Sequence, residues 1–170
     1  MMLTQKHVFC YSDSEKMKCI CTRNETEIWR CGMEKIFYQP ENAWMGDFIP
    51  YYENGTYYLY YLRDPRVKPL EYAEETTWHL ITTKDFLHYE NCGEAIARGG
   101  KDERNRNIYT GSVLRDPNGL CTAFYTAYNA DFKTDGRSVQ SVMMAQGQTP
   151  ETLRTVENFY MVADGDLYEP

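Results

Sequence analysis

The stretch Trp44-Met-Gly-Asp47-Phe-Ile-Pro-Tyr-Tyr-Glu-Asn54-Gly55-Thr-Tyr-Tyr-Leu-Tyr-Tyr-Leu62 decides the fold class of this sequence. Its second half is dominated by tyrosine, which favours strands. Asn54-Gly55 separates two strand-forming runs, and Asn-Gly is the strongest short hairpin signal because both residues tolerate positive φ. The stretch therefore predicts an antiparallel hairpin that holds the Asp47 carboxylate at the start of its first strand. A carboxylate fixed in this way suits catalysis or sugar binding.

The same pattern returns about 64 residues later, which indicates an internal repeat. Gly111-Ser112 takes the place of Gly46-Asp47, and another Asn-Gly turn and aromatic run follow. A third strand, a polar turn and a short fourth strand follow in both copies. Each copy is thus expected to be a four-stranded antiparallel meander, the unit of a propeller blade. The alternative is a β-sandwich with similar turn spacing.

The domain organisation follows from this repeat. Blades are expected at about residues 44–95 and 108–158 of a propeller domain over 37–170, whereas 1–36 are strands whose place in the fold the sequence leaves open. The smallest propellers have four blades, so a chain with two to three blades cannot close a ring alone. Either it is the front part of a longer enzyme, or copies associate through their open blade edges.

Charge and hydropathy restrict the partners. The net charge is −7 and the basic residues are scattered, which argues against a nucleic-acid partner. No stretch is apolar and long enough for a membrane-spanning helix or a signal peptide, so we expect no membrane partner and a cytoplasmic location. In that compartment, cysteines are expected to be free thiols. Cys19-Ile-Cys21 lacks a second pair at zinc spacing, so we expect neither a metal nor a cofactor.

Four motifs, in order along residues 37–157, resemble those of glycoside hydrolase family 32. Trp44-Met-Gly-Asp47 is similar to its Trp-Met-Asn-Asp-Pro motif, and the segment from Trp78 to Tyr89 is similar to its Trp-Gly-His-Ala-Thr-Ser-x-Asp-Leu-x-x-Trp motif. Ile108–Ser112 and Ala123–Thr126 resemble its Phe-Ser-Gly-Ser and Leu-Phe-Tyr-Thr-Gly elements. The resemblance implies an all-β, five-bladed propeller, a fold shared with family 43. It also implies a hydrolase of fructosides or related oligosaccharides.

The resemblance also implies three carboxylates from successive blades, with Asp47 as the nucleophile. The stabilising Asp stands in an Arg-Asp-Pro motif, but Asp64 follows a second strand and Asp116 lies in a hairpin turn. Neither matches the family position, so the stabiliser and the acid/base Glu are expected beyond Pro170. The isolated chain is therefore predicted to be inactive. An inverting enzyme of the family 43 type and a non-catalytic carbohydrate-binding partial propeller are the alternatives.

Further substrate-binding candidates have alternative structural roles. Trp44 and Trp78 either stack on a sugar ring or pack within the blades. Ser112 either donates to a substrate hydroxyl or only begins a strand, while Tyr109 and Thr110 belong to the same motif. The other polar residues of these repeats are interpreted as structural or non-catalytic: His79, Asp85, His88 and Glu90. The connection 97–107 is expected to border the mouth of the propeller, where its Arg and Asn residues either contact substrate or, as favoured here, belong to a solvated loop.

Overall fold

The computed structural model describes residues 7–13, 16–22, 28–32, 38–65 and 75–162. The chain divides into two units, Met1–Tyr38 and Gln39–Pro170, which are described separately. All the described strands pair in antiparallel sheets. Within the described residues, no helix is both long and apolar enough to cross a membrane.

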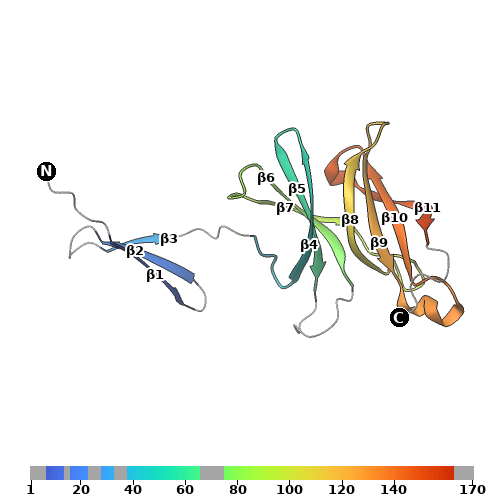
Figure 1. The fold of residues 1–170 in the computed structure, drawn as a ribbon, viewed down its shortest axis with the longest axis horizontal. Coiled ribbons are helices and arrows are strands. Elements are labelled where there is room, and N and C mark those ends of the chain that lie inside the picture. The colour runs from blue at the N-terminus through green and yellow to red at the C-terminus, as the bar shows by residue number, and fades with distance from the viewer. Residues whose placement is uncertain (1–6, 14–15, 23–27, 33–37, 66–74, 163–170) are drawn as a thin grey trace. The chain divides into compact units, whose positions relative to one another are not determined.

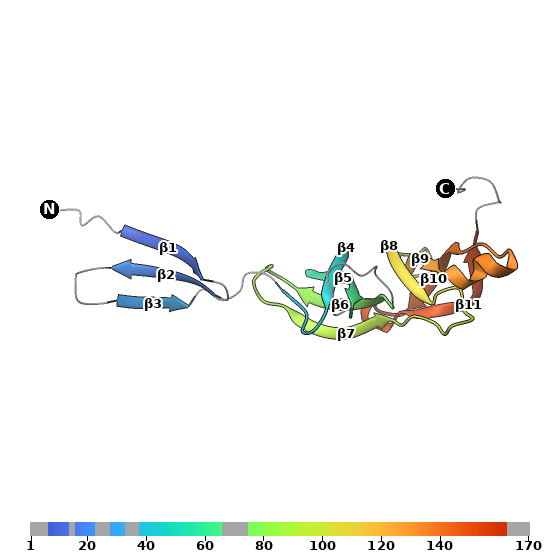
Figure 2. The ribbon, with the colours of Figure 1, turned by 90° about the horizontal axis from the view of Figure 1, so that it is seen from below.

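The first unit contains one three-stranded sheet. Its strands are β1 (His7–Asp13), β2 (Lys16–Thr22) and β3 (Ile28–Gly32), and β2 lies in the middle. Figure 2 shows the three strands side by side. Both pairings run without a register shift.

The second unit begins with a four-stranded meander, as the sequence predicts. Its strands are β4 (Trp44–Glu53), β5 (Thr56–Asp64), β6 (Thr77–Thr83) and β7 (Glu90–Ile96), paired in that order. Asn54 and Gly55 form the predicted tight turn, with φ of 50° and 81°. Positive φ at both positions is the requirement that selects Asn-Gly.

A second meander follows with the same order of pairing. It comprises β8 (Asn107–Arg115), β9 (Cys121–Tyr128), β10 (Gln140–Gly147) and β11 (Arg154–Met161), with short 3₁₀ helices η1 (Ala130–Asp135) and η2 (Pro150–Thr152) around β10. Figure 1 shows this sheet beside the first, with β8 next to β4. The structure thus confirms the predicted pair of four-stranded antiparallel sheets.

The apolar core lies between these two sheets. Trp78 of β6 is fully buried there, with Tyr60 of β5 and Tyr125 of β9 against its ring. Gly111 of β8 allows this packing, because a Cβ there would lie 2.9 Å from Cζ2 of Trp78 and 2.8 Å from Cα of Tyr125. Burial of large aromatic side chains is a strong stabilising contribution.

Polar groups also join the two sheets. The Tyr60 hydroxyl donates to the Pro150 carbonyl at 2.6 Å, and the Thr76 hydroxyl donates to the Ile108 carbonyl at 2.5 Å. The Trp78 indole N–H donates to the Tyr109 carbonyl at 2.8 Å. Each bond gives a backbone carbonyl a side-chain donor, and together the three bonds tie one sheet to the other.

The structure corrects the sequence alignment of the two repeats. The connection between β4 and β5 is Asn54–Gly55, whereas that between β8 and β9 is the longer Asp116–Leu120. Matching the Asn-Gly pairs therefore misaligns the first strands. In strand register, Gly111 corresponds to Ile49 rather than to Gly46.

Asp116 begins the longer connection and organises it. Its Oδ1 accepts from the backbone N–H groups of Asn118 and Leu120, each at 2.9 Å, and Gly119 has a φ of 81°. This is the local hydrogen bonding by which Asp favours turns. The interpretation of Arg115-Asp116-Pro117 as turn chemistry is confirmed.

Candidate functional site

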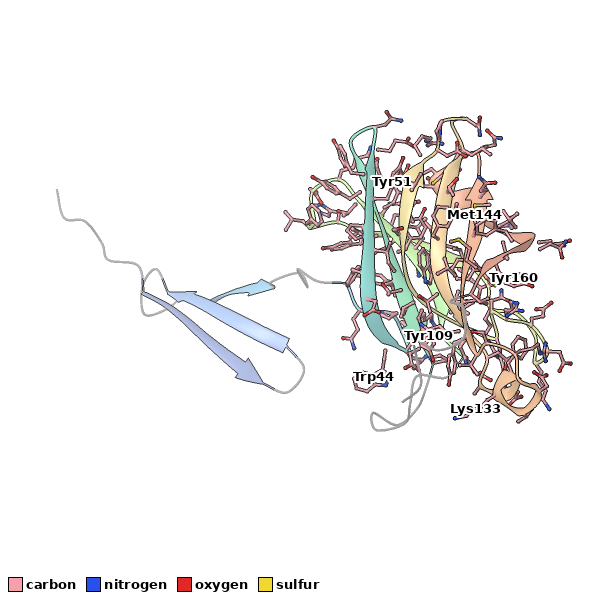
Figure 3. All side chains as sticks on the ribbon, turned by 45° about the vertical axis from the view of Figure 1, so that its right-hand side comes forward. Trp44, Tyr51, Tyr109, Lys133, Met144 and Tyr160 are labelled. Atoms are coloured by element: carbon pink, nitrogen blue, oxygen red, sulfur yellow. The ribbon has the colours of Figure 1, made fainter. Side chains whose placement is uncertain are left out.

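The first strands of the two sheets, β4 and β8, begin at the same end of the paired sheets. In Figure 3, Trp44 and Tyr109 lie near this end, whereas Tyr51 lies towards the opposite one. We call the first the Asp47 end and the second, where both hairpin connections lie, the turn end. The candidate residues fall at the Asp47 end because β4 and β8 both start there.

Asp47 is the extra residue of a β-bulge. Gly46 pairs with Leu62 and Phe48 pairs with Tyr61, so Asp47 has no partner of its own on β5. Its φ is 34°, in the left-handed region that Asp tolerates better than most residues. The side chain is exposed. Bulges redirect a side chain relative to the strand and are enriched beside active sites.

The second sheet carries a bulge at the equivalent position. Ile108 pairs with Ala127 and Gly111 pairs with Tyr125, which leaves Tyr109 and Thr110 opposite Thr126. Thr126 is the sixth residue of β9 from Cys121, and Tyr61 is the sixth of β5 from Thr56. The two bulges therefore occupy the same register, and Asp47 corresponds to Tyr109 rather than to Ser112.

The predicted substrate-binding residues of β8 differ in exposure. Tyr109 is half-buried, Thr110 is exposed, and Ser112 is exposed one step further along the same face. The Tyr109 carbonyl is occupied by the Trp78 indole, which fixes the backbone of the bulge. Thr110 and Ser112 thus present hydroxyl groups to solvent, each able to donate and accept a hydrogen bond.

The two tryptophan candidates have opposite environments. Trp44 begins β4 and is 47% exposed, so part of its ring is available for stacking. Trp78 is 0% exposed, with its N–H already bonded to Tyr109. The expectation that Trp78 contacts substrate is therefore corrected: a buried indole offers no face to a sugar. It supports the β8 bulge from within the core.

Asp64 also lies at the Asp47 end. It is the last residue of β5, stands in register with Trp44, and is 4% exposed. The structure places it within β5, whereas the sequence pattern predicts a position just after that strand. The β4–β5 hairpin brings the end of β5 beside the start of β4. The Asn54-Gly55 turn in the sequence already predicted this arrangement.

The residues interpreted as structural have local partners. Oδ1 of Asp85 accepts from the backbone N–H groups of Leu87 and His88, each at 2.9 Å, and its Oδ2 lies 2.7 Å from His88 Nδ1. These bonds hold the pKa of Asp85 well below its ordinary value. Glu90 is exposed at the start of β7. Burial, reinforced by the charge of Arg63, lowers the pKa of His79 to about 4.

The connection 97–107 is held by contacts with the second sheet. The buried Asn129 amide donates to the carbonyls of Lys101 and Glu103, both at 2.8 Å. Arg106 Nη1 donates to Asp131 at 2.7 Å, and the guanidinium of Arg104 lies 3.8 Å from the ring centroid of Tyr160. The interpretation of this segment as a simple solvated loop misses these contacts.

At the turn end, a charged pair that sequence analysis missed joins the sheets. Nε of Arg115 donates to Glu53 Oε1 at 2.9 Å, Nη2 bonds the other carboxylate oxygen, and Nη1 donates to the Gln148 carbonyl at 3.0 Å. The Arg115 hydrogen bond is the main cause that lowers the pKa of Glu53. Glu53 and Arg115 are each the last residue of the first strand of their sheet. The signal in the sequence that could have predicted this ion pair is the opposite charge of these two equivalent positions.

Comparison with known families identifies the chain. The sequence profile described as "Glycosyl hydrolases family 32 N-terminal domain" matches residues 37–164. The chain belongs to this family. The resemblance inferred from the motifs around Asp47 is thereby confirmed. No curated relative matches the chain.

Solved structures of glycosidases resemble this family 32 chain in fold. Fructan 1-exohydrolase IIa from Cichorium intybus matches with a TM-score of 0.57 at 17% identity over 71% of this chain and 22% of that one. Fructofuranosidase from Schwanniomyces occidentalis, complexed with fructose, matches at 0.56 and 22% identity over 71% and 25%. The GH43_1 enzyme from Xanthomonas citri, complexed with xylotriose, matches at 0.51 and 17% identity over 67% and 32%.

These similarities concern the fold alone. The family 32 chain spans about a quarter of the length of the two fructan- and fructose-related structures that it matches. Its two four-stranded sheets fit a partial β-propeller, as the repeat predicts. The number of five blades remains a prediction.

Proposed function

We propose that this chain forms part of a glycoside hydrolase that acts on fructosides or related oligosaccharides, with Asp47 as its nucleophile. The observation that carries the proposal is the bulge in β4, which gives Asp47 a left-handed backbone and an exposed carboxylate. A carboxylate that only closed a strand would need no such backbone. Family membership supports the reaction class.

The proposed chemistry is a double displacement. A retaining glycosidase uses two carboxyl groups roughly 5–5.5 Å apart, one as nucleophile and one as acid and then base. Asp47 would attack the anomeric carbon and form a covalent glycosyl–enzyme, which water then resolves. The acid/base Glu and the stabilising Asp are proposed to come from blades of a five-bladed ring outside the present sequence.

The neighbouring side chains suit sugar recognition. Trp44 offers an exposed aromatic face for the C–H groups of a sugar ring. Thr110 and Ser112 offer hydroxyls on the exposed face of β8, and the half-buried Tyr109 precedes Thr110 in the same strand. In this proposal, Trp78 acts only indirectly, through its bond to the Tyr109 carbonyl.

Activity as a function of chain length tests the proposal first. The 170-residue chain and a longer product of the same gene are assayed on sucrose, inulin and aryl glycosides. We expect hydrolysis only in the longer protein, because one carboxylate cannot perform both steps. Hydrolysis by the 170-residue chain would mean that self-association supplies the missing groups. No hydrolysis by either protein would favour a carbohydrate-binding role.

The role of Asp47 is tested in whichever protein is active. Asp47→Asn keeps the size of the side chain and is expected to lower kcat by roughly 10³-fold or more. Glu90→Gln, at the start of β7, is the matched control and should leave kcat unchanged. Equal rates for Asp47→Asn and Glu90→Gln would exclude Asp47. The anomeric form of the first product separates retention from the inverting alternative.

A further inference from the structure

Two hollows lie one after the other along β7, the last strand of the first four-stranded sheet. The larger has a volume of about 610 Å³ and lies at the turn end, where β5 begins, β6 ends and η2 contributes to the wall. The smaller, of about 350 Å³, is lined by residues 94–97 and by residues 153–155 around the start of β11. Figure 2 shows β7 and β11 on the same side of the second unit.

Both hollows share the same two walls. On the β7 wall, Cys92 lines the larger hollow and Glu94 lines the smaller. On the opposite wall, Glu151 and Leu153 do the same. β7 runs from the turn end to the Asp47 end, because successive strands of its sheet are antiparallel. At about 3.3 Å per residue, its seven residues extend over roughly 20 Å. We call the two hollows together the β7 groove, and its length suits an extended ligand.

Two bulges make β7 a poor partner for a further strand. Asn91 and Gly93 pair with neighbouring residues of β6, which leaves Cys92 without a partner on that strand. Ala95 is left out of the pairing in the same way. β7 is an edge strand, and bulges on an edge oppose the addition of another strand. The β7 groove is therefore unsuited to an extended peptide that pairs with the sheet.

The larger hollow offers the kinds of group that bind a sugar. Thr56 and Thr82 line it with hydroxyls that both donate and accept hydrogen bonds. Lys84 contributes a donor, and the exposed Glu151 contributes an acceptor. The half-buried Tyr58 adds an aromatic ring for the C–H groups of a sugar. Burial raises the pKa of Tyr58, and the charge of Glu151 adds to this effect, so that carboxylate lies near the tyrosine hydroxyl.

A neutral ligand fits this lining better than an organic cation. Lys84 lines the same hollow as Glu151, and its ammonium group would repel a cation. In the smaller hollow, Glu94 and Arg154 likewise bring side chains of both signs to the wall. A groove that presents donors and acceptors along its length matches a ligand rich in hydroxyl groups.

We propose that the β7 groove is a second carbohydrate-binding site, which holds an extended chain of sugar units apart from the Asp47 end. The class of ligand rests on the proposed function, in which the substrate is a fructoside or a related oligosaccharide. β7 leads into the connection 97–107 at the Asp47 end, so a chain held in the groove points towards that end. A long substrate is then held at two places and a short one at only one.

The thiol of Cys92 reports occupation of the groove directly. It lines the larger hollow, and trypsin places it in peptide 85–98 with no other cysteine. Burial raises the pKa of this thiol, so its alkylation by iodoacetamide is followed at alkaline pH on the 170-residue chain. Inulin oligosaccharides at about ten times their dissociation constant should slow this alkylation about tenfold, because only the unoccupied fraction reacts. Sucrose is too short to span both hollows and should protect much less.

Two variants and a control test which groups hold the sugar. Glu151→Ala should raise the inulin concentration needed for protection about tenfold, because it removes a charged acceptor. Glu157→Ala, at an exposed position of β11 outside the groove, is the matched control and should leave the protection unchanged. Asp47→Asn should also leave it unchanged, because Asp47 belongs to the other site. Each alkylation rate is compared with that of the same variant without sugar.

The outcomes separate the groove from the proposed function. Alkylation of Cys92 that inulin does not slow, or equal protection in Glu151→Ala and Glu157→Ala, would overturn the groove even if the longer protein hydrolyses inulin. Protection by spermidine in place of inulin would overturn it in favour of a cation site. Protection by inulin without hydrolysis by the longer protein would support the groove and remove the catalytic proposal.

Discussion

The two four-stranded sheets of the second unit share one topology but use it differently. Each has a bulge at the same register of its first strand, yet the first sheet places Asp47 there and the second places Tyr109 and Thr110. The connections at the turn end also differ, Asn54–Gly55 against Asp116–Leu120. A repeated backbone thus provides equivalent positions, and the residue at each position decides what that blade contributes.

The two ends of the sheet pair show a second difference. At the turn end, Glu53 and Arg115 bond each other across the sheets. At the Asp47 end, Trp44, Asp47 and Thr110 are exposed. Stability and chemistry are therefore separated along the strands: side chains between the sheets and at the turn end hold them together, while the side chains proposed for catalysis and binding are free to face solvent.

The largest expected effect concerns the two tryptophans. Trp78→Ala should lower the free energy of unfolding by about 3–5 kcal/mol, because it removes a fully buried indole and leaves a cavity. Trp44→Ala should lower it much less, because this residue is 47% exposed in the folded chain. Urea unfolding of both variants gives the comparison. Similar losses would contradict the assignment of one tryptophan to the core and the other to the surface.

The next effect distinguishes two glycines that look equivalent in the sequence. Gly111→Ala should cost about 1–3 kcal/mol, since the added Cβ meets the β9 backbone and Trp78. At Gly46 the nearest atom to an added Cβ is Leu62 Cβ, 3.9 Å away, which is ordinary contact. Gly46→Ala should therefore be almost neutral in the same urea titration. A reversed order would restore the alignment of Gly111 with Gly46.

A smaller effect should appear in the pH dependence of stability, through His79 of β6 in the first four-stranded sheet. The folded-state pKa of His79 is lowered to about 4 from 6.5, mainly by burial. In the unfolded chain, His79 is therefore protonated below pH 6.5, whereas in the folded chain it is protonated only below about pH 4. The free energy of unfolding consequently decreases as the pH falls from 6.5 to about 4. His79→Gln should flatten this part of the profile. An NMR titration should find the His79 ring neutral at about pH 5.5, where an ordinary histidine is mostly protonated.

The smallest expected effect concerns the charged pair at the turn end. The pKa of Glu53 is lowered from 4.5, so its ionised form stabilises the folded chain above that pH and the contribution is lost as the pH falls through the folded pKa. Glu53→Gln should lower the urea midpoint at neutral pH and reduce the loss of stability on acidification. Glu94→Gln, on an exposed position of β7, is the control and should match the unchanged chain.

The strands of the second unit could be predicted from the sequence because the signals for them are local. Asn54-Gly55 specifies a turn through its own φ angles, and the tyrosine-rich run after it specifies a strand. The position of Asp47 at the start of that hairpin could be predicted for the same reason. The bulge could not be predicted, because an extra residue appears only when β4 is paired with β5.

What the sequence determined by itself is the hairpin repeat, the family and the position of Asp47 near the start of the first strand of its sheet. Tertiary structure alone decided that Trp78 is buried, that Gly111 aligns with Ile49, and that Glu53 meets Arg115. The physical reason is the distance along the chain over which each effect acts, because turn and strand preferences act between neighbouring residues. Burial and register depend on atoms that only folding brings together, and on connection lengths that shift one strand against another.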